Sequence, residues 1–109
     1  MKILPRVEEI ILLSIWRLED RAYGMAIRKE VMRVTGEKWL LGAIYGPLGR
    51  LHRKGFVTTI KGDPMPKRGG RAKVYYRLTR EGIKALARMK EINATIWKDV
   101  SKLDYAKPS

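Results

Sequence analysis

Basic side chains are concentrated in one part of this sequence. Ten Lys and Arg residues lie between Arg50 and Arg80 beside a single acid, Asp63, so this stretch carries +9 of the formal net charge of +13. Solvated surfaces usually mix charges of both signs, so this concentration favours a polyanionic partner over a merely soluble face. The candidate contacts to a nucleic acid are Lys38, Gly42, Ala43, Tyr45, Gly46, Gly49, Arg50, Arg53, Lys54, Lys67, Arg68, Arg71, Lys73 and Tyr75.

Other chemistry is poorly supported by the residue types present. The 109 residues include no cysteine and only one histidine, His52, which argues against disulfides, thiol catalysis and multi-histidine metal sites. We find no nucleophile–base pairing, paired carboxylates or cofactor loop, so the sequence predicts no enzyme, no metal and no cofactor. No apolar run is long enough to cross a bilayer, and residues 1–16 contain Glu8 and Glu9, so we expect a cytoplasmic protein without membrane contact.

The stretch 42–55 is expected to be a short helix with two different faces. Ile44, Leu48 and Leu51 recur at helical spacing on one side, and Gly55 is suited to end the helix. The opposite side carries three glycines together with two arginines: Gly42, Gly46, Gly49, Arg50 and Arg53. Each glycine costs about 1 kcal/mol of helix stability relative to alanine. Either this is a weak surface helix held by packing, or the missing side chains let a phosphate strand come close, which we favour.

A strand, a basic loop and a second strand are expected after this helix. The run 56–60 is β-branched and aromatic, residues 62–71 contain too much Pro and Gly for regular structure, and 74–78 form the return strand. Alternation places Tyr76 toward the core and Tyr75 on the contact face. A helix that leads into a long basic hairpin is typical of a winged helix, which binds nucleic acid through the helix and the loop.

Two further helices are expected before this unit. The first begins near Pro5, and Glu8 and Glu9 are expected to complement its positive end. It is apolar nearly all round, so it should be buried on more than one side. The second spans about residues 23–35, with Val34 expected in the core and Gly24 allowing close approach to the first helix. This helix, the following turn and the helix at 42–55 form a predicted helix-turn-helix. Because Pro47 lacks an N–H, the third helix should begin near Ala43 or Ile44, or bend at Pro47.

The last helix should be long and should have Thr79 as its N-cap. Its apolar stripe continues for about seven turns, beyond the core of so small a domain, which argues for a second copy of the chain as partner. The predicted dimer interface consists of Ile11, Ile15, Leu86, Met89, Ile92, Ile96, Val100 and Leu103. Trp16, Met89 and Trp97 are candidates for lining a cavity that takes a flat apolar ligand, with plain core packing as the alternative.

Several segments together resemble the PadR family of transcriptional regulators. The run 42–51 with Gly55-Phe56-Val57 resembles that family's recognition helix, and 75–79 with Gly82 resembles the motif after its wing. Ala43 stands where the family usually has Ser or Thr, so one implied hydroxyl contact has no counterpart here. The resemblance spans about residues 11–86 and implies a DNA-binding regulator, a repressor, that dimerises through its last helix.

The expected fold class is α+β, mainly α: a winged helix-turn-helix domain at 1–79, with three helices and a two-stranded wing, then a dimerisation helix and tail at 80–109. A symmetric dimer would place two recognition helices about 34 Å apart on an inverted repeat of double-stranded DNA. A small-molecule effector is a further hypothesis. The alternative is a winged-helix module that binds RNA or a protein assembly.

Overall fold

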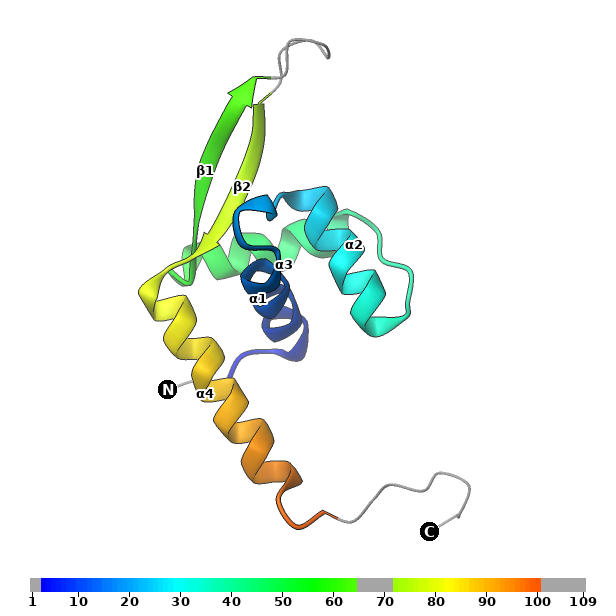
Figure 1. The fold of residues 1–109 in the computed structure, drawn as a ribbon, viewed down its shortest axis with the longest axis vertical. Coiled ribbons are helices and arrows are strands. Elements are labelled where there is room, and N and C mark those ends of the chain that lie inside the picture. Colours follow the sequence, from blue (N-terminus) through cyan, green and yellow to red (C-terminus); the bar gives the residue numbers. More distant parts are fainter. Residues whose placement is uncertain (1–2, 65–71, 101–109) are drawn as a thin grey trace.

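The computed structural model describes residues 3–64 and 72–100, arranged as a helical body from which a hairpin projects (Figure 1). The elements in chain order are α1 (Arg6–Leu18), η1 (Glu19–Arg21), α2 (Gly24–Thr35), α3 (Gly42–Arg53), β1 (Val57–Pro64), β2 (Ala72–Leu78) and α4 (Arg80–Trp97). The fold is therefore mainly helical with one two-stranded antiparallel sheet, as expected. No helix in the described ranges is both long and apolar enough to cross a membrane.

Helix α1 lies at the centre of the body and packs against α2, α3 and α4. Ile11, Leu12 and Ile15 are at most 1% exposed, because neighbouring helices cover α1 on several sides. Ile11, Ile15 and Met89 were predicted at a dimer interface, but they are at most 5% exposed and belong to the protomer's own core, so they offer almost no surface to a second chain. Val34 was expected in the core and is 52% exposed, because it lies in the last turn of α2, where it lines a small surface hollow with residues of α1.

The hairpin is longer than the sequence suggests. Val57 pairs with Leu78 and Lys61 pairs with Val74, and after an irregularity Pro64 pairs with Ala72. The local signal of Gly and Pro predicted irregular structure from residue 62, which is wrong for the first three residues of that range. Cross-strand pairing outweighs local propensity here, and a two-stranded sheet has only edge strands, which tolerate a proline near their ends.

Helix α3 begins at Gly42 and ends in a Schellman motif. Gly55 adopts a φ of 79°, the N–H of Phe56 donates to the carbonyl of Leu51 at 3.0 Å, and the N–H of Gly55 donates to that of His52 at 3.0 Å. Pro47 therefore lies in the second turn of the helix rather than the first. It cannot donate to the carbonyl of Ala43, but Ala43 is exposed, so water can satisfy that oxygen.

Helix α4 begins at the predicted cap. The N–H of Gly82 donates to Oγ1 of Thr79 at 3.0 Å, and this hydroxyl in turn donates to the carbonyl of Gly55 at 2.6 Å. A Cβ at Gly82 would collide with the carbonyl of Phe56, so only glycine allows α4 to start this close to the hairpin. The helix ends at Trp97 after 18 residues, and Asp99 has a φ of 62°.

The expected length of seven turns is therefore wrong. The apolar spacing continues past Trp97 in the sequence, but the described chain leaves the helix there. Of the predicted interface residues, Val100 lies beyond the helix end and Leu103 lies outside the described residues.

Candidate nucleic-acid interface

Three glycines on the exposed face of α3 have open space around them. A Cβ built at Gly42 meets nothing within 4 Å, one at Gly46 meets only Nη1 of Arg50 at 3.8 Å, and one at Gly49 meets only Nη1 of Arg53 at 3.4 Å. None of the three has a positive φ. Neither internal packing nor backbone conformation therefore requires glycine at these positions, although each costs helix stability.

Tyr45 joins α3 to the start of α2. A Cβ at Gly24 would overlap the hydroxyl and ring of Tyr45, so the missing side chain of Gly24 makes room for this tyrosine. Gly24 was expected to allow close approach to the first helix, and the structure shows that α3 is the neighbour instead. Tyr45 is 46% exposed, so part of its ring remains on the surface predicted to contact nucleic acid.

The flank of α3 that faces the hairpin forms a shallow hollow of about 300 Å³. It is lined by Tyr45, Leu48, Gly49, His52, Arg53, Thr59 and Tyr76. Tyr76, the predicted core candidate, is half-buried and packs against the core. Burial, with a smaller contribution from Tyr45, raises the pKa of Tyr76 above its ordinary value. The recognition helix and the hairpin therefore meet in one continuous surface, as the winged-helix prediction requires.

The base of the hairpin is held against the start of α2. The N–H of Tyr76 donates to the carbonyl of Ala22 at 2.7 Å. The rings of Tyr23 and Tyr75 meet edge to face with centroids 5.7 Å apart, and Nζ of Lys73 lies 4.1 Å from the Tyr23 ring centroid. Tyr75 and Lys73 were predicted to contact nucleic acid, and this cluster orients both of them. Lys67, Arg68 and Arg71 lie outside the described residues.

Two predicted contact residues on α3 are bound to a carboxylate that the sequence analysis did not link to them. Nε of Arg50 donates to Glu8 Oε2 at 3.0 Å, and Nζ of Lys54 donates to Glu8 Oε1 at 2.6 Å. Glu8 is 1% exposed, whereas the side chains of Arg50 and Lys54 are about half exposed. Glu8 was expected to complement the positive end of the first helix. Its separation of more than forty residues from its partners left no sequence signal for this ion-pair triad.

A second carboxylate links α1 to α2. Glu30 accepts from Arg33 and from Arg17 of α1, at 2.6 and 3.1 Å. The hydrogen bond from Arg33, with smaller contributions from Arg17, holds the pKa of Glu30 below its ordinary value in spite of its burial. In the turn after α2, Arg28 donates to the carbonyl of Trp39 at 2.6 Å, which orders the segment carrying the exposed Lys38.

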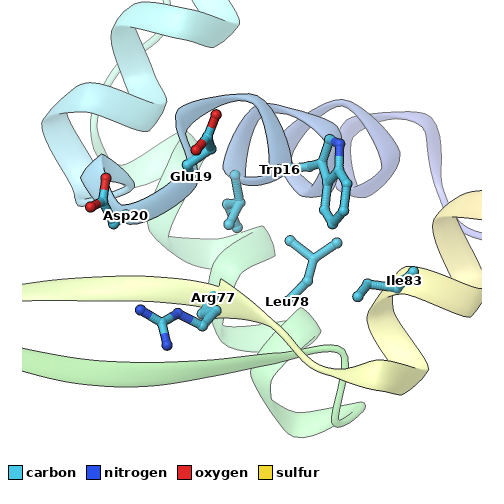
Figure 2. Close-up of a pocket in the computed structure, with 7 residues that line it drawn as sticks. Trp16, Glu19, Asp20, Arg77, Leu78 and Ile83 are labelled. Carbon is cyan, nitrogen blue, oxygen red and sulfur yellow. The ribbon is translucent and has the colours of Figure 1, made fainter.

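An open apolar hollow of about 540 Å³ lies between α1, β2 and α4. In Figure 2 the indole of Trp16 points toward Leu78 and Ile83, and Glu19 and Asp20 lie at the other end. Trp16 also lines a neighbouring hollow of similar volume, but Met89 and Trp97 line a third. The three residues predicted to share a ligand cavity therefore do not share one within the protomer. Within residues 3–64 and 72–100, no group of three acidic or histidine side chains is placed to hold a metal ion.

The fold and the surface together define a winged helix-turn-helix protein, in which a glycine-faced recognition helix lies beside a two-stranded wing. A family model described as the transcriptional regulator PadR-like family matches residues 12–88. The chain belongs to this family.

Solved structures agree with this assignment. RosR from H. salinarum, crystallised from NaBr, is 28% identical with a TM-score of 0.69, covering 90% of this chain and 81% of that one. A PadR family transcription regulator from Clostridium difficile is 25% identical with a TM-score of 0.67, covering 88% and 94%. A PadR-like regulator from Bacillus cereus, at 21% identity and a TM-score of 0.69 over 86% of each chain, shows the fold alone. The comparison with curated proteins found no significant match.

Proposed function

We propose that this protein is a DNA-binding repressor that acts as a dimer on an inverted repeat, with α3 in the major groove and the wing on the adjacent backbone. The observation that carries the proposal is the exposed face of α3. Packing inside the protomer does not require these glycines, and each one weakens the helix. A favourable contact with another molecule would explain why they are present. Close approach of the helix backbone to the groove wall supplies such a contact.

Few side chains on this face can reach base edges. Tyr45, Arg50 and Arg53 are the ones that flank the glycines, and arginine is well suited to guanine. Sequence would be recognised by these three and otherwise by the shape of the DNA. Lys54, directly after α3, and the cations of the wing, Lys73 among them, neutralise phosphates.

Exposed apolar residues of α1 and α4 support the dimer. These side chains are each 44–64% exposed, and they line neighbouring hollows along the two helices: Leu13, Trp16, Ile83, Ile96 and Trp97. A second copy of α4 laid along this band would cover them. In such a dimer the Trp16 hollow would be enclosed further, which is where a flat apolar effector would bind. The division into a DNA-binding unit at 1–79 and a dimerisation unit at 80–109 belongs to the same proposal.

The proposal is tested by salt-dependent binding to DNA. Selection from a random duplex pool should yield an inverted repeat, and its affinity should fall with salt with a log–log slope of about −0.9 per phosphate contacted. Light scattering of the free protein should give twice the protomer mass. An affinity that barely changes with salt, a protomer mass at working concentration, or a preference for structured RNA over every duplex would overturn it.

A further inference from the structure

Glu8 holds a buried negative charge directly behind the proposed DNA-binding helix. The side chain is 1% exposed, and each of its oxygens accepts from a different cation, from Arg50 of α3 or from Lys54 at the end of this helix. A buried carboxylate is unfavourable unless it is paired, so folding requires these two cations to stay in place. Each cation nevertheless remains about half exposed.

Within residues 3–64 and 72–100, Arg50 makes a side-chain hydrogen bond only through Nε, so its outer nitrogens can donate to another acceptor. Glu8 is bound through Nε, and guanidinium groups carry four further N–H donors on the two Nη atoms. Nη1 lies 3.8 Å from the position that a Cβ on Gly46 would occupy, so the group lies along the glycine face. Helical side chains point toward the N-terminus of their helix, which directs Arg50 over the preceding turn.

We propose that Glu8 is a positioning residue for DNA binding, which fixes Arg50 with its Nη atoms presented beside the glycine face. This inference rests on the proposed function and adds a residue that does not itself contact DNA. When a freely rotating arginine side chain is immobilised on binding, rotamer entropy is lost. Arg50 is already held by Glu8 in the free protein, so DNA binding loses less of this entropy. A rigid support behind the contacting group also keeps it aligned with its acceptor.

The opposite role, in which Glu8 withdraws the two cations from DNA, fits the structure less well. The triad keeps a net charge of +1, both cations reach the surface, and the donor used by Arg50 is the one nearest its backbone. A sequestering carboxylate would instead occupy the outer nitrogens. The two roles predict opposite changes in affinity, so one substitution separates them.

The decisive variant is Glu8→Gln, with Glu9→Gln as its matched control. Glu9 is the adjacent residue of α1 and is also buried, but it pairs with Asn93 of α4 and with Arg6. Binding to a duplex selected by the wild-type protein is measured by fluorescence anisotropy over a salt series, below both unfolding midpoints. We expect Glu8→Gln to weaken binding about tenfold, which corresponds to the entropy lost when one arginine side chain is ordered on binding. Glu9→Gln should leave the affinity unchanged.

Two results would overturn the inference without touching the proposed function, because the wild-type protein would still bind. Unchanged affinity in Glu8→Gln would show that the triad only stabilises the fold. Tighter binding with a salt slope steeper by about 0.9 per released cation would show sequestration. If the wild-type protein binds no duplex, the proposed function itself fails.

A second pair of variants decides the matter if Glu8→Gln does not fold. Arg50→Lys keeps the positive charge and can still pair with Glu8. An ammonium group that is bound to Glu8, however, has no separate donors to direct at DNA, as the Nη atoms of arginine do. Arg17→Lys is the control, because Arg17 also donates to a carboxylate through Nε, to Glu30 at 3.1 Å, but is not among the proposed DNA contacts. We expect Arg50→Lys to lose about tenfold in affinity and Arg17→Lys to leave the affinity unchanged. Equal effects of the two substitutions would overturn the positioning role.

Discussion

Replacing the glycines on the exposed face of α3 should make the protein more stable and a worse DNA binder. In Gly46→Ala the new methyl meets only Nη1 of Arg50 at ordinary contact distance. In Gly49→Ala it meets only Nη1 of Arg53 at 3.4 Å, the end of a flexible side chain that can move. Each substitution should therefore gain close to the full difference in helix propensity, about 0.8–1.0 kcal/mol. Thermal unfolding should shift upward by roughly 4–8 °C per kcal/mol for a domain of this size.

Binding should change in the opposite direction. If the helix backbone lies against the groove wall, an added methyl has to be accommodated in a packed interface, which costs about 1–3 kcal/mol. That corresponds to a loss of roughly 5- to 150-fold in affinity for the selected duplex. Circular dichroism gives the unfolding midpoint, and anisotropy at fixed salt gives the affinity.

The reasoning fails in two distinguishable ways. Higher stability with unchanged affinity would mean that α3 does not approach DNA closely at Gly46 and Gly49. Lower stability would mean that the space around these positions is not open in the folded protein. A gain in stability together with a loss of affinity is the only combination that the proposal allows.

Three further predictions follow from the contacts. Gly82→Ala should destabilise the protein by at least about 1–3 kcal/mol, because its Cβ collides with the Phe56 carbonyl; a thermal midpoint at or above the wild-type value would contradict the packing described. Ile96→Asp should convert the dimer to protomers in light scattering, since it charges an apolar position that is 64% exposed, and a mass that stays doubled would place the interface elsewhere. Glu30→Gln should lower the free energy of unfolding at neutral pH, measured with urea, because the lowered pKa of Glu30 favours its ionised form in the folded state. This stabilisation is present above the ordinary value of 4.5 and is lost as the pH falls through the lowered one, so a difference between wild type and variant that persists undiminished at about pH 3 would refute the assignment.

Local patterns in the sequence predicted the elements and the character of the surface. Residues 42–55 follow a helical apolar spacing, and Gly55 and Thr79 carry end signals that both act in the structure. The concentration of cations after Arg50 and the glycines opposite Ile44 need no tertiary information either. Such features depend on neighbours within a few residues, whose interactions are fixed by helix or strand geometry.

Contacts between distant segments decided the rest. Local propensity ended the first strand too early, because pairing with residues 72–74 is not visible in the strand's own residues. Charge patterning assigned Glu8 to a helix end, whereas the crossing of α1 over α3 makes it the anchor of Arg50. The sequence by itself thus determined that one helix has a face of three glycines and two arginines, and it predicted that this face contacts nucleic acid. Only the tertiary structure decided what stands behind that face, because a buried ion pair depends on where two helices meet.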